Sequence, residues 1–205
     1  MNRITAYIRQ SLQDIYPPEE VKALSMLICC DMLGVDALDI YMGKDIILSA
    51  CKQRELENII FRLQKNEPIQ YIRGYAEFCG RNFRVAPGVL IPRPETAELV
   101  DLIVKENPDA RRLLDIGTGS GCIAISLDKN LPDAKVDAWD ISEEALAIAC
   151  KNNEELDAQV TFRRQDVFSA DGIQGASYDI IVSNPPYVTA VSYTHLRAHE
   201  TPEHL

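Results

Sequence analysis

The segment Arg112-Leu-Leu-Asp-Ile-Gly-Thr-Gly-Ser-Gly-Cys-Ile-Ala-Ile125 joins a short apolar run to an apolar helix through a loop with three glycines. Glycine lets the backbone turn tightly and approach a ligand closely, and the first turn of a helix offers unpaired N–H groups. The dinucleotide pattern G-x-G-x-x-G would need glycine at 122, where this chain has Cys122. The loop therefore predicts a ligand site between a strand and a helix, and its spacing disfavours NAD.

Helices and short buried strands alternate on both sides of this loop. The spacing predicts helices at 95–106, 120–130 and 143–156, and strands at 112–116, 135–140, 159–163 and 178–183. The strands are apolar with an acid at or near one end, which is typical of parallel strands covered on both faces. The fold class is therefore α/β: a doubly wound, Rossmann-like domain whose ligands bind beyond the carboxyl ends of the strands.

Asp140 ends the strand that follows the glycine loop. An acid at this place would accept hydrogen bonds from both ribose hydroxyls of an adenosine. The alternative is that Asp140 caps the next helix or a turn, as aspartates at strand ends often do. The loop spacing G-x-G-x-G is typical of methyltransferases, so the sequence predicts S-adenosylmethionine as the adenosyl ligand.

The tetrapeptide Asn184-Pro-Pro-Tyr187 directly follows the last predicted strand. Two prolines stiffen the backbone and leave its carbonyl oxygens as acceptors. If the Asn184 side-chain oxygen and the Pro185 carbonyl accept the two hydrogens of a planar nitrogen, the nitrogen lone pair is aimed at an incoming methyl group, and Tyr187 stacks on the flat group. The alternative is an ordinary Asn-Pro turn with a half-buried tyrosine.

The first third of the chain has a different character. From 1 to 68 the apolar residues recur at helical spacing, which predicts three or four short helices; Gly34 would stop the second and Pro68 the last. The stretch Gln70 to Val85 predicts a β-hairpin around Gly74 and Gly80. We therefore expect a helical domain at 1–68, a β-hairpin linker at 69–93 and an α/β domain at 94–190.

Composition narrows the class of protein. The 205 residues are 46% apolar and 25% charged, with a formal charge of -10 and a pI near 4.8. This balance disfavours direct binding to nucleic acid through bulk charge. The six cysteines (Cys29, Cys30, Cys51, Cys79, Cys122 and Cys150) show no CxxC spacing, and the chain has no secretory segment and no apolar run that would span a bilayer. We expect a soluble cytoplasmic protein with reduced thiols.

Five segments are specific enough to identify a family: Glu67-Pro-Ile-Gln-Tyr-Ile-Arg-Gly74, Glu77-Phe-Cys-Gly80, Pro87-Gly-Val-Leu-Ile-Pro-Arg-Pro-Glu-Thr96, Leu114-Asp-Ile-Gly-Thr-Gly-Ser-Gly-Cys-Ile-Ala-Ile125 and Ser183-Asn-Pro-Pro-Tyr-Val188. Together they resemble the protein-(glutamine-N5) methyltransferase family, whose best-known members act on peptide chain release factors. The resemblance implies methyl transfer from S-adenosylmethionine to the side-chain N5 of the glutamine in the Gly-Gly-Gln motif, with S-adenosylhomocysteine as product.

The resemblance also implies roles for individual residues. Asp166 would accept from the adenine amino group, and the segment Pro92 to Glu95 would border the active site. The implied cofactor-binding residues are Asp115, Gly117, Thr118, Gly119, Gly121, Asp140, Asp166, Val167 and Asn184. The implied substrate-binding residues are Asn184, Pro185, Pro186, Tyr187 and Arg93, of which Asn184, Pro185 and Tyr187 are catalytic. The helical domain and hairpin would dock the release factor, and no metal is implied.

Three alternatives remain open. Sister enzymes methylate a glutamine of a ribosomal protein, although Arg93-Pro-Glu95 favours the release-factor branch. An adenine-N6 methyltransferase would use the same tetrapeptide on an exocyclic amine. Residues 191–205 do not resemble the family and suggest a non-native tail after a truncated domain, which leaves an inactive fragment as the third alternative. This tail holds His195, His199 and His204, whose spacing gives no convincing metal site.

Overall fold

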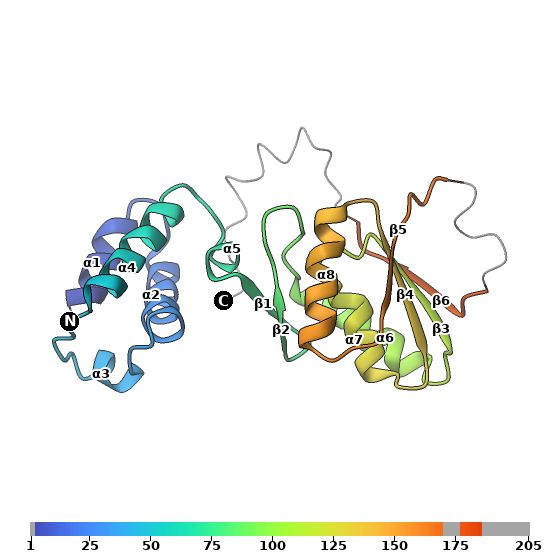
Figure 1. Ribbon diagram of the computed structural model, residues 1–205. Coiled ribbons are helices and arrows are strands. Elements are labelled where there is room, and N and C mark those ends of the chain that lie inside the picture. Colours follow the sequence, from blue (N-terminus) through green and yellow to red (C-terminus); the bar gives the residue numbers. More distant parts are fainter. Residues whose placement is uncertain (1–2, 170–176, 186–205) are drawn as a thin grey trace. The chain divides into compact units, whose positions relative to one another are not determined.

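The computed structural model describes residues 3–169 and 177–185, which fall into two compact units (Figure 1). The first unit comprises the described residues up to Arg73, and the second begins at Gly74. We describe each by itself. None of the helices in these ranges is long and apolar enough to cross a membrane.

The first unit is helical. Its elements are α1 Arg3–Leu12, α2 Pro18–Leu27, a π-helical turn η1 Ile28–Met32, α3 Ala37–Tyr41, α4 Ala50–Leu63 and α5 Ile69–Arg73. One apolar face of each longer helix is buried, at the positions that the helical spacing predicts: Ile4, Ile8, Leu12, Val21, Leu24, Ile28, Leu56, Ile59, Ile60 and Leu63. Burial of each such side chain stabilises the fold by about 1.5–3 kcal/mol, so these helices depend on one another. The hydroxyl of Tyr16 donates to the Leu63 carbonyl at 2.8 Å and ties α4 to the end of α1.

The segment before the hairpin differs from the sequence prediction. Residues 70–73 were expected to begin a strand, but they lie in α5, and the first strand begins at Tyr75. The reason is local: Pro68 suits the start of a helix, and its carbonyl accepts the N–H groups of Tyr71 and Ile72. Gly74, with φ of 86°, then ends the helix. Pro68 thus starts α5 and does not end α4, which stops at Leu63.

The second unit is an α/β domain built on a parallel sheet. Its elements are β1 Tyr75–Phe78, β2 Arg81–Arg84, α6 Pro94–Glu106, β3 Arg112–Ile116, α7 Cys122–Asn130, β4 Lys135–Asp140, α8 Glu143–Glu155, β5 Thr161–Arg164 and β6 Ile180–Ser183. The sheet order is β5-β4-β3-β6, and all three pairings are parallel. The Rossmann-like fold class is therefore confirmed, with boundaries within about two residues of those predicted.

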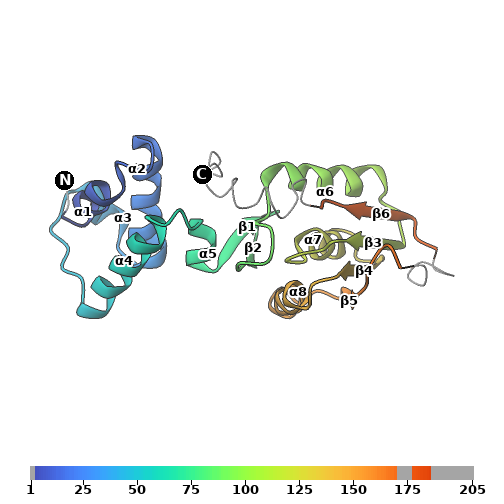
Figure 2. The same cartoon turned by 90° about the horizontal axis from the view of Figure 1, so that it is seen from above.

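The helices α6, α7 and α8 cover one face of this sheet (Figure 2). Alternate strand residues share a core with them, namely Leu113, Val136, Ala138 and Val182, and Val160 joins this core just before β5. On the opposite face Leu114 and Trp139 are also buried, whereas Ile181 is 52% exposed. The described part of the chain thus places helices on one face only.

The hairpin β1–β2 shares the core of the α/β unit. Phe83 is fully buried there and meets Phe78 edge-on, with ring centroids 6.0 Å apart. Strand β2 lies against α8, where the Arg84 guanidinium pairs with the Glu155 carboxylate at 2.7 Å. Because Arg84 and Glu155 are both about half exposed, this ion pair adds little stability, and the buried aromatic pair holds the hairpin in place.

Candidate active site

Four strand ends meet at one edge of the sheet. The pairing register aligns Ile116 of β3 with Trp139 of β4 and with Ser183 of β6. Because parallel strands end at the same edge, Gly117, Asp140 and Asn184 each follow one of three adjacent positions. The sequence-predicted residues at 115–121, 140 and 184 are therefore brought together.

The glycine loop is held by the main chain of β4. The N–H groups of Gly117 and Thr118 both donate to the Trp139 carbonyl, at 2.8 and 3.0 Å. Gly117 and Gly119 have positive φ, and a Cβ added at either would meet no atom of the described residues within 4 Å. The space beside these two glycines is therefore open. Such open space next to a helix start is what a bound adenosyl ligand requires.

Asp115 lies at the end of β3 with 1% of its surface exposed. The Thr118 hydroxyl donates to its Oδ2 at 2.6 Å, and the N–H of Ala124 also favours the carboxylate, but among the described residues no donor makes a hydrogen bond of good geometry to Oδ1. Burial raises the pKa of this carboxyl to about 6, and the bond from Thr118 offsets part of that rise. A buried oxygen with unused acceptor capacity fits the cationic amino group of S-adenosylmethionine.

Asp140 joins the glycine loop to α8. Its Oδ2 accepts the N–H of Gly119 and its Oδ1 accepts the N–H of Ser142, both at 2.9 Å. Of the local roles that the sequence left as alternatives, Asp140 thus has the turn, because Ser142 itself caps α8 by accepting the N–H of Ala145. A carboxylate has about four acceptor sites, so two backbone bonds still leave capacity for the hydroxyls of a ribose.

The loop after β5 carries two further predicted residues. Asp166 is exposed, and its Oδ1 accepts the N–H of Phe168 at 2.9 Å in a local turn. Val167 is 38% exposed. Ile141, which the sequence analysis missed, follows Asp140 and is 64% exposed. An apolar residue directly after a strand-end acid was the signal that would have found it.

Hydrogen bonds hold both the side chain of Asn184 and the residue before it. Its Nδ2 donates to the Thr96 hydroxyl of α6 at 2.8 Å, and Thr96 is 8% exposed. The preceding Ser183 donates its hydroxyl to the Ile116 carbonyl at 2.8 Å and so fixes β6 beside the glycine loop. Because Nδ2 is directed at Thr96, covalent geometry directs Oδ1 of the amide away from α6. No spacing pattern connects Asn184 to Thr96, which lies 88 residues away in the sequence.

The other predicted substrate residues are placed only in part. Pro185 is exposed directly after Asn184, whereas Pro186 and Tyr187 lie outside the described residues, as do the three histidines and the predicted tail. Arg93 is exposed at the N-cap of α6, three residues before Thr96. The bond between Thr96 and Asn184 therefore brings the segment with Arg93 next to the start of the tetrapeptide. Within the described ranges, no group of three or more His, Cys, Asp or Glu side chains could hold a metal ion.

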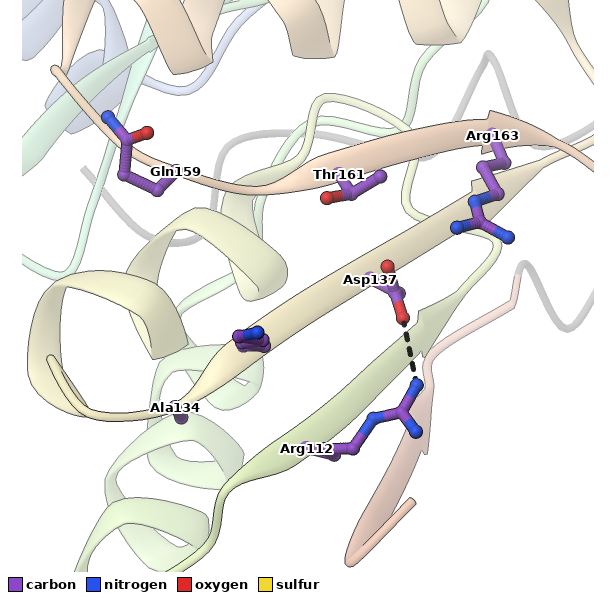
Figure 3. A pocket seen from close by; sticks show the side chains of 7 residues that line it. Arg112, Ala134, Asp137, Gln159, Thr161 and Arg163 are labelled. Atoms are coloured by element: carbon purple, nitrogen blue, oxygen red, sulfur yellow. Dashed lines mark ion pairs between the residues drawn. The ribbon is translucent and has the colours of Figure 1, made fainter. Parts of the chain in front are cut away.

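A separate hollow lies on the face of the sheet that α6, α7 and α8 leave uncovered (Figure 3). It is lined by residues in or just before β3, β4 and β5: Arg112, Ala134, Lys135, Asp137, Gln159, Thr161 and Arg163. The Arg112 guanidinium lies 3.9 Å from the Asp137 carboxylate, which also accepts the Tyr178 hydroxyl. None of the predicted site residues lines this hollow, so it is not part of the candidate active site.

Two family models match the chain. The methyltransferase small domain matches residues 95–201, and the PrmC N-terminal domain matches residues 4–74. The release factor glutamine methyltransferase of Bacteroides thetaiotaomicron is 96% identical over 198 residues, which are 97% of this chain and 71% of that protein. The protein of the same name from Flavobacterium psychrophilum is 41% identical over 87% of this chain and 64% of its own length.

Among solved structures, the 16S rRNA N2 G1207 methyltransferase of T. thermophilus, in complex with AdoMet and guanosine, is similar with a TM-score of 0.48 and 25% identity. The match covers 57% of this chain and 33% of that one.

Proposed function

Because the chain belongs to the family of release factor glutamine methyltransferases, which depend on S-adenosylmethionine, we propose that the edge formed by the glycine loop and Asn184 methylates a glutamine side chain. The proposed acceptor is the N5 atom of the glutamine in the Gly-Gly-Gln motif of a peptide chain release factor in the cytoplasm. One observation carries the proposal: the Asn184 amide is clamped by Thr96 at the strand end next to the glycine loop.

In this proposal, residues at the ends of the strands bind the cofactor. The buried Asp115 carboxylate would hold the amino group of S-adenosylmethionine in the open space beside Gly117 and Gly119, and Asp140 would hold the ribose hydroxyls. Ile141 and Val167 offer exposed apolar surface for the flat adenine ring, with Asp166 as acceptor for its amino group. When bound, the cofactor supplies a methyl group on a positively charged sulfur.

The reacting half orients a poor nucleophile. The nitrogen of an amide is weakly nucleophilic because its lone pair is delocalised into the carbonyl. Oδ1 of Asn184 and the carbonyl of Pro185 would accept its two hydrogens and turn the lone pair toward the methyl group, with Tyr187 stacked on the amide plane. A new N–C bond forms as the S–C bond breaks, and one amide proton is released to solvent. In this proposal these residues act by positioning the substrate amide.

Substrate docking belongs to other parts of the chain in this proposal. Arg93, exposed at the start of α6, and the hairpin would contact the protein substrate, together with the helical unit. Docking roles of this kind favour a protein substrate over an adenine in nucleic acid. The net charge of -10 also disfavours binding to nucleic acid.

The test is transfer of labelled methyl from S-adenosylmethionine. The 205-residue chain and the full-length protein are each incubated with release factor, with a release factor whose Gly-Gly-Gln glutamine is replaced by alanine, with ribosomal protein and with duplex DNA. We expect label in the unaltered release factor only. Label in ribosomal protein or DNA, or in the altered release factor, would contradict the proposed acceptor.

Protonation of Asp115 should control cofactor affinity. Its pKa is raised to about 6 by burial, and the positive charges of S-adenosylmethionine favour its ionised form. A proton therefore competes with the cofactor, and we expect affinity to fall about tenfold for each pH unit below the pKa. Calorimetry with S-adenosylhomocysteine, which keeps the amino group, measures this. Asp115→Asn should bind weakly with no pH dependence, and a pH-independent affinity in the unchanged protein would refute the role.

The stability of the protein without cofactor should change with pH in the direction opposite to that of the cofactor affinity. An ordinary aspartate has a pKa of 3.8, so between 3.8 and about 6 the folded state binds a proton at Asp115 that the unfolded state does not. This contribution to stability is present at low pH and is lost as pH rises through 6. Thermal melting of the unchanged protein and of Asp115→Asn, compared between pH 3.8 and about 6, separates the contribution of Asp115 from that of the other carboxyls.

A further inference from the structure

Asn152 is a buried amide in α8 that no sequence pattern singled out. It is 1% exposed, and all of its hydrogen-bonding groups are used. Its Oδ1 accepts the N–H of Arg84 at 2.7 Å, and its Nδ2 donates to the carbonyls of Arg84 at 3.1 Å and Ser120 at 2.8 Å. One side chain thereby links three segments that lie far apart in the sequence: strand β2, the glycine loop and α8.

The bond to Ser120 acts on the loop that borders the open space. Ser120 lies between Gly119 and Gly121, two residues with positive φ, so no regular helical or strand pattern fixes the peptide that follows it. The N–H of Asn152 satisfies the carbonyl of that peptide. Without it, the structure would have to turn the peptide or leave a buried acceptor unpaired.

The bonds to Arg84 give the amide its support. Asn152 pairs with both the N–H and the carbonyl of Arg84, as a neighbouring strand would, so the amide plane is fixed relative to β2. The Arg84 side chain adds an ion pair with Glu155 one turn further along α8. Rotation of the Asn152 amide would break all three hydrogen bonds together.

We propose that Asn152 is a positioning residue for the cofactor. It holds the Ser120 carbonyl, and with it the loop Gly117 to Gly121, in the shape that binds S-adenosylmethionine, with the main chain of β2 as its support. This rests on the proposed function in that the loop is taken as the cofactor site. Asn152 does not touch the reacting atoms, so its effect falls on cofactor affinity and not on the rate with saturated cofactor.

The chain offers a matched control one residue away. Asn152→Asp keeps the acceptor for Arg84 N–H but replaces the donor to Ser120 by an oxygen. Asn153→Asp makes the same chemical change, but within the described ranges the Asn153 side chain bonds through its Oδ1 alone, which accepts the N–H of Val160 at 3.1 Å, and a carboxylate preserves that bond. Asn152→Ala removes the amide without adding charge and serves if the aspartate variant does not fold.

Two readouts test the proposal. Calorimetry with S-adenosylhomocysteine should show affinity weakened at least about tenfold in the Asn152 variants and unchanged in Asn153→Asp. Hydrogen exchange, measured without ligand, should show faster exchange of the Gly119 and Gly121 amides in the Asn152 variants alone. With saturating cofactor, methyl transfer by the full-length protein should keep its rate within about threefold.

The outcomes separate this inference from the proposed function. If the unchanged chain binds no S-adenosylhomocysteine but loop exchange still rises only in the Asn152 variants, the cofactor site is wrong and the role of Asn152 in holding the loop stands. If the Asn152 variants melt earlier while affinity and loop exchange match those of Asn153→Asp, Asn152 is merely structural and the inference is overturned.

Discussion

Asn184→Ala should reduce methyl transfer by on the order of 10²- to 10³-fold while the protein still binds S-adenosylmethionine. The alanine removes the oxygen proposed to orient the substrate nitrogen, whereas the glycine loop, Asp115 and Asp140 remain in place. Single-turnover transfer to release factor and calorimetry with S-adenosylhomocysteine measure the two effects separately. Turnover at the normal rate would remove Asn184 from the mechanism.

Thr96 supplies the control for this experiment. Thr96→Val keeps the shape of the side chain but deprives Asn184 Nδ2 of its acceptor, so we expect a smaller loss of turnover, about three- to tenfold. Thr96→Ser keeps the hydroxyl and should restore the rate. Equal losses in the valine and serine variants would indicate a packing effect at this buried position and not a positioning role.

Gly121→Ala should have the largest effect on stability and should also weaken cofactor binding. Gly121 has φ of 80° at the start of α7, and an added Cβ would lie 3.1 Å from Ile125 Cδ1 and 3.2 Å from Ala149 Cβ. Left-handed strain and overpacking each cost about 1–3 kcal/mol, so we expect a loss of about 2–6 kcal/mol in the free energy of unfolding. Chemical denaturation of the domain measures it.

Gly119→Ala is the informative comparison. Its φ is also positive, at 56°, but the added Cβ would meet no atom within 4 Å in the part of the chain that the structure describes. Its loss of stability should therefore be limited to about 1–2 kcal/mol of backbone strain, while cofactor binding suffers because the methyl group enters the space left for the ligand. If Gly119→Ala bound cofactor normally, the open space beside the loop would not be the ligand site.

The sequence predicted the sheet and the strand-end motifs because their signals are local. The glycines of the loop adopt positive φ, and the apolar runs at 112–116 and 135–140 form strands with those bounds. It failed at α5, where the strand-forming residues Tyr71 and Ile72 follow a proline that starts a helix. A five-residue helix is too short for the helical spacing of apolar residues to be recognised in the sequence.

The partners of the site residues were beyond the reach of sequence patterns. Thr96 meets Asn184 across 88 positions, and Asn152 meets Arg84 across 68, so no spacing rule connects them. For Asp140 the sequence posed capping and ribose binding as alternatives. The structure shows that Ser142 caps the helix, while Asp140 accepts the N–H groups of Ser142 and Gly119, and these two bonds leave its carboxylate acceptor capacity for a ribose.

Trp139 is the only tryptophan in the chain, and its carbonyl receives two N–H groups of the glycine loop. Since these bonds involve the main chain, the indole ring is not needed for them, yet it is attached one residue before Asp140. Besides its eight tyrosines, the chain therefore carries a single tryptophan fluorophore, which can be excited selectively and lies on the strand that anchors the loop. Its emission comes from one environment, so loop ordering and cofactor exchange become optical signals that need no added dye.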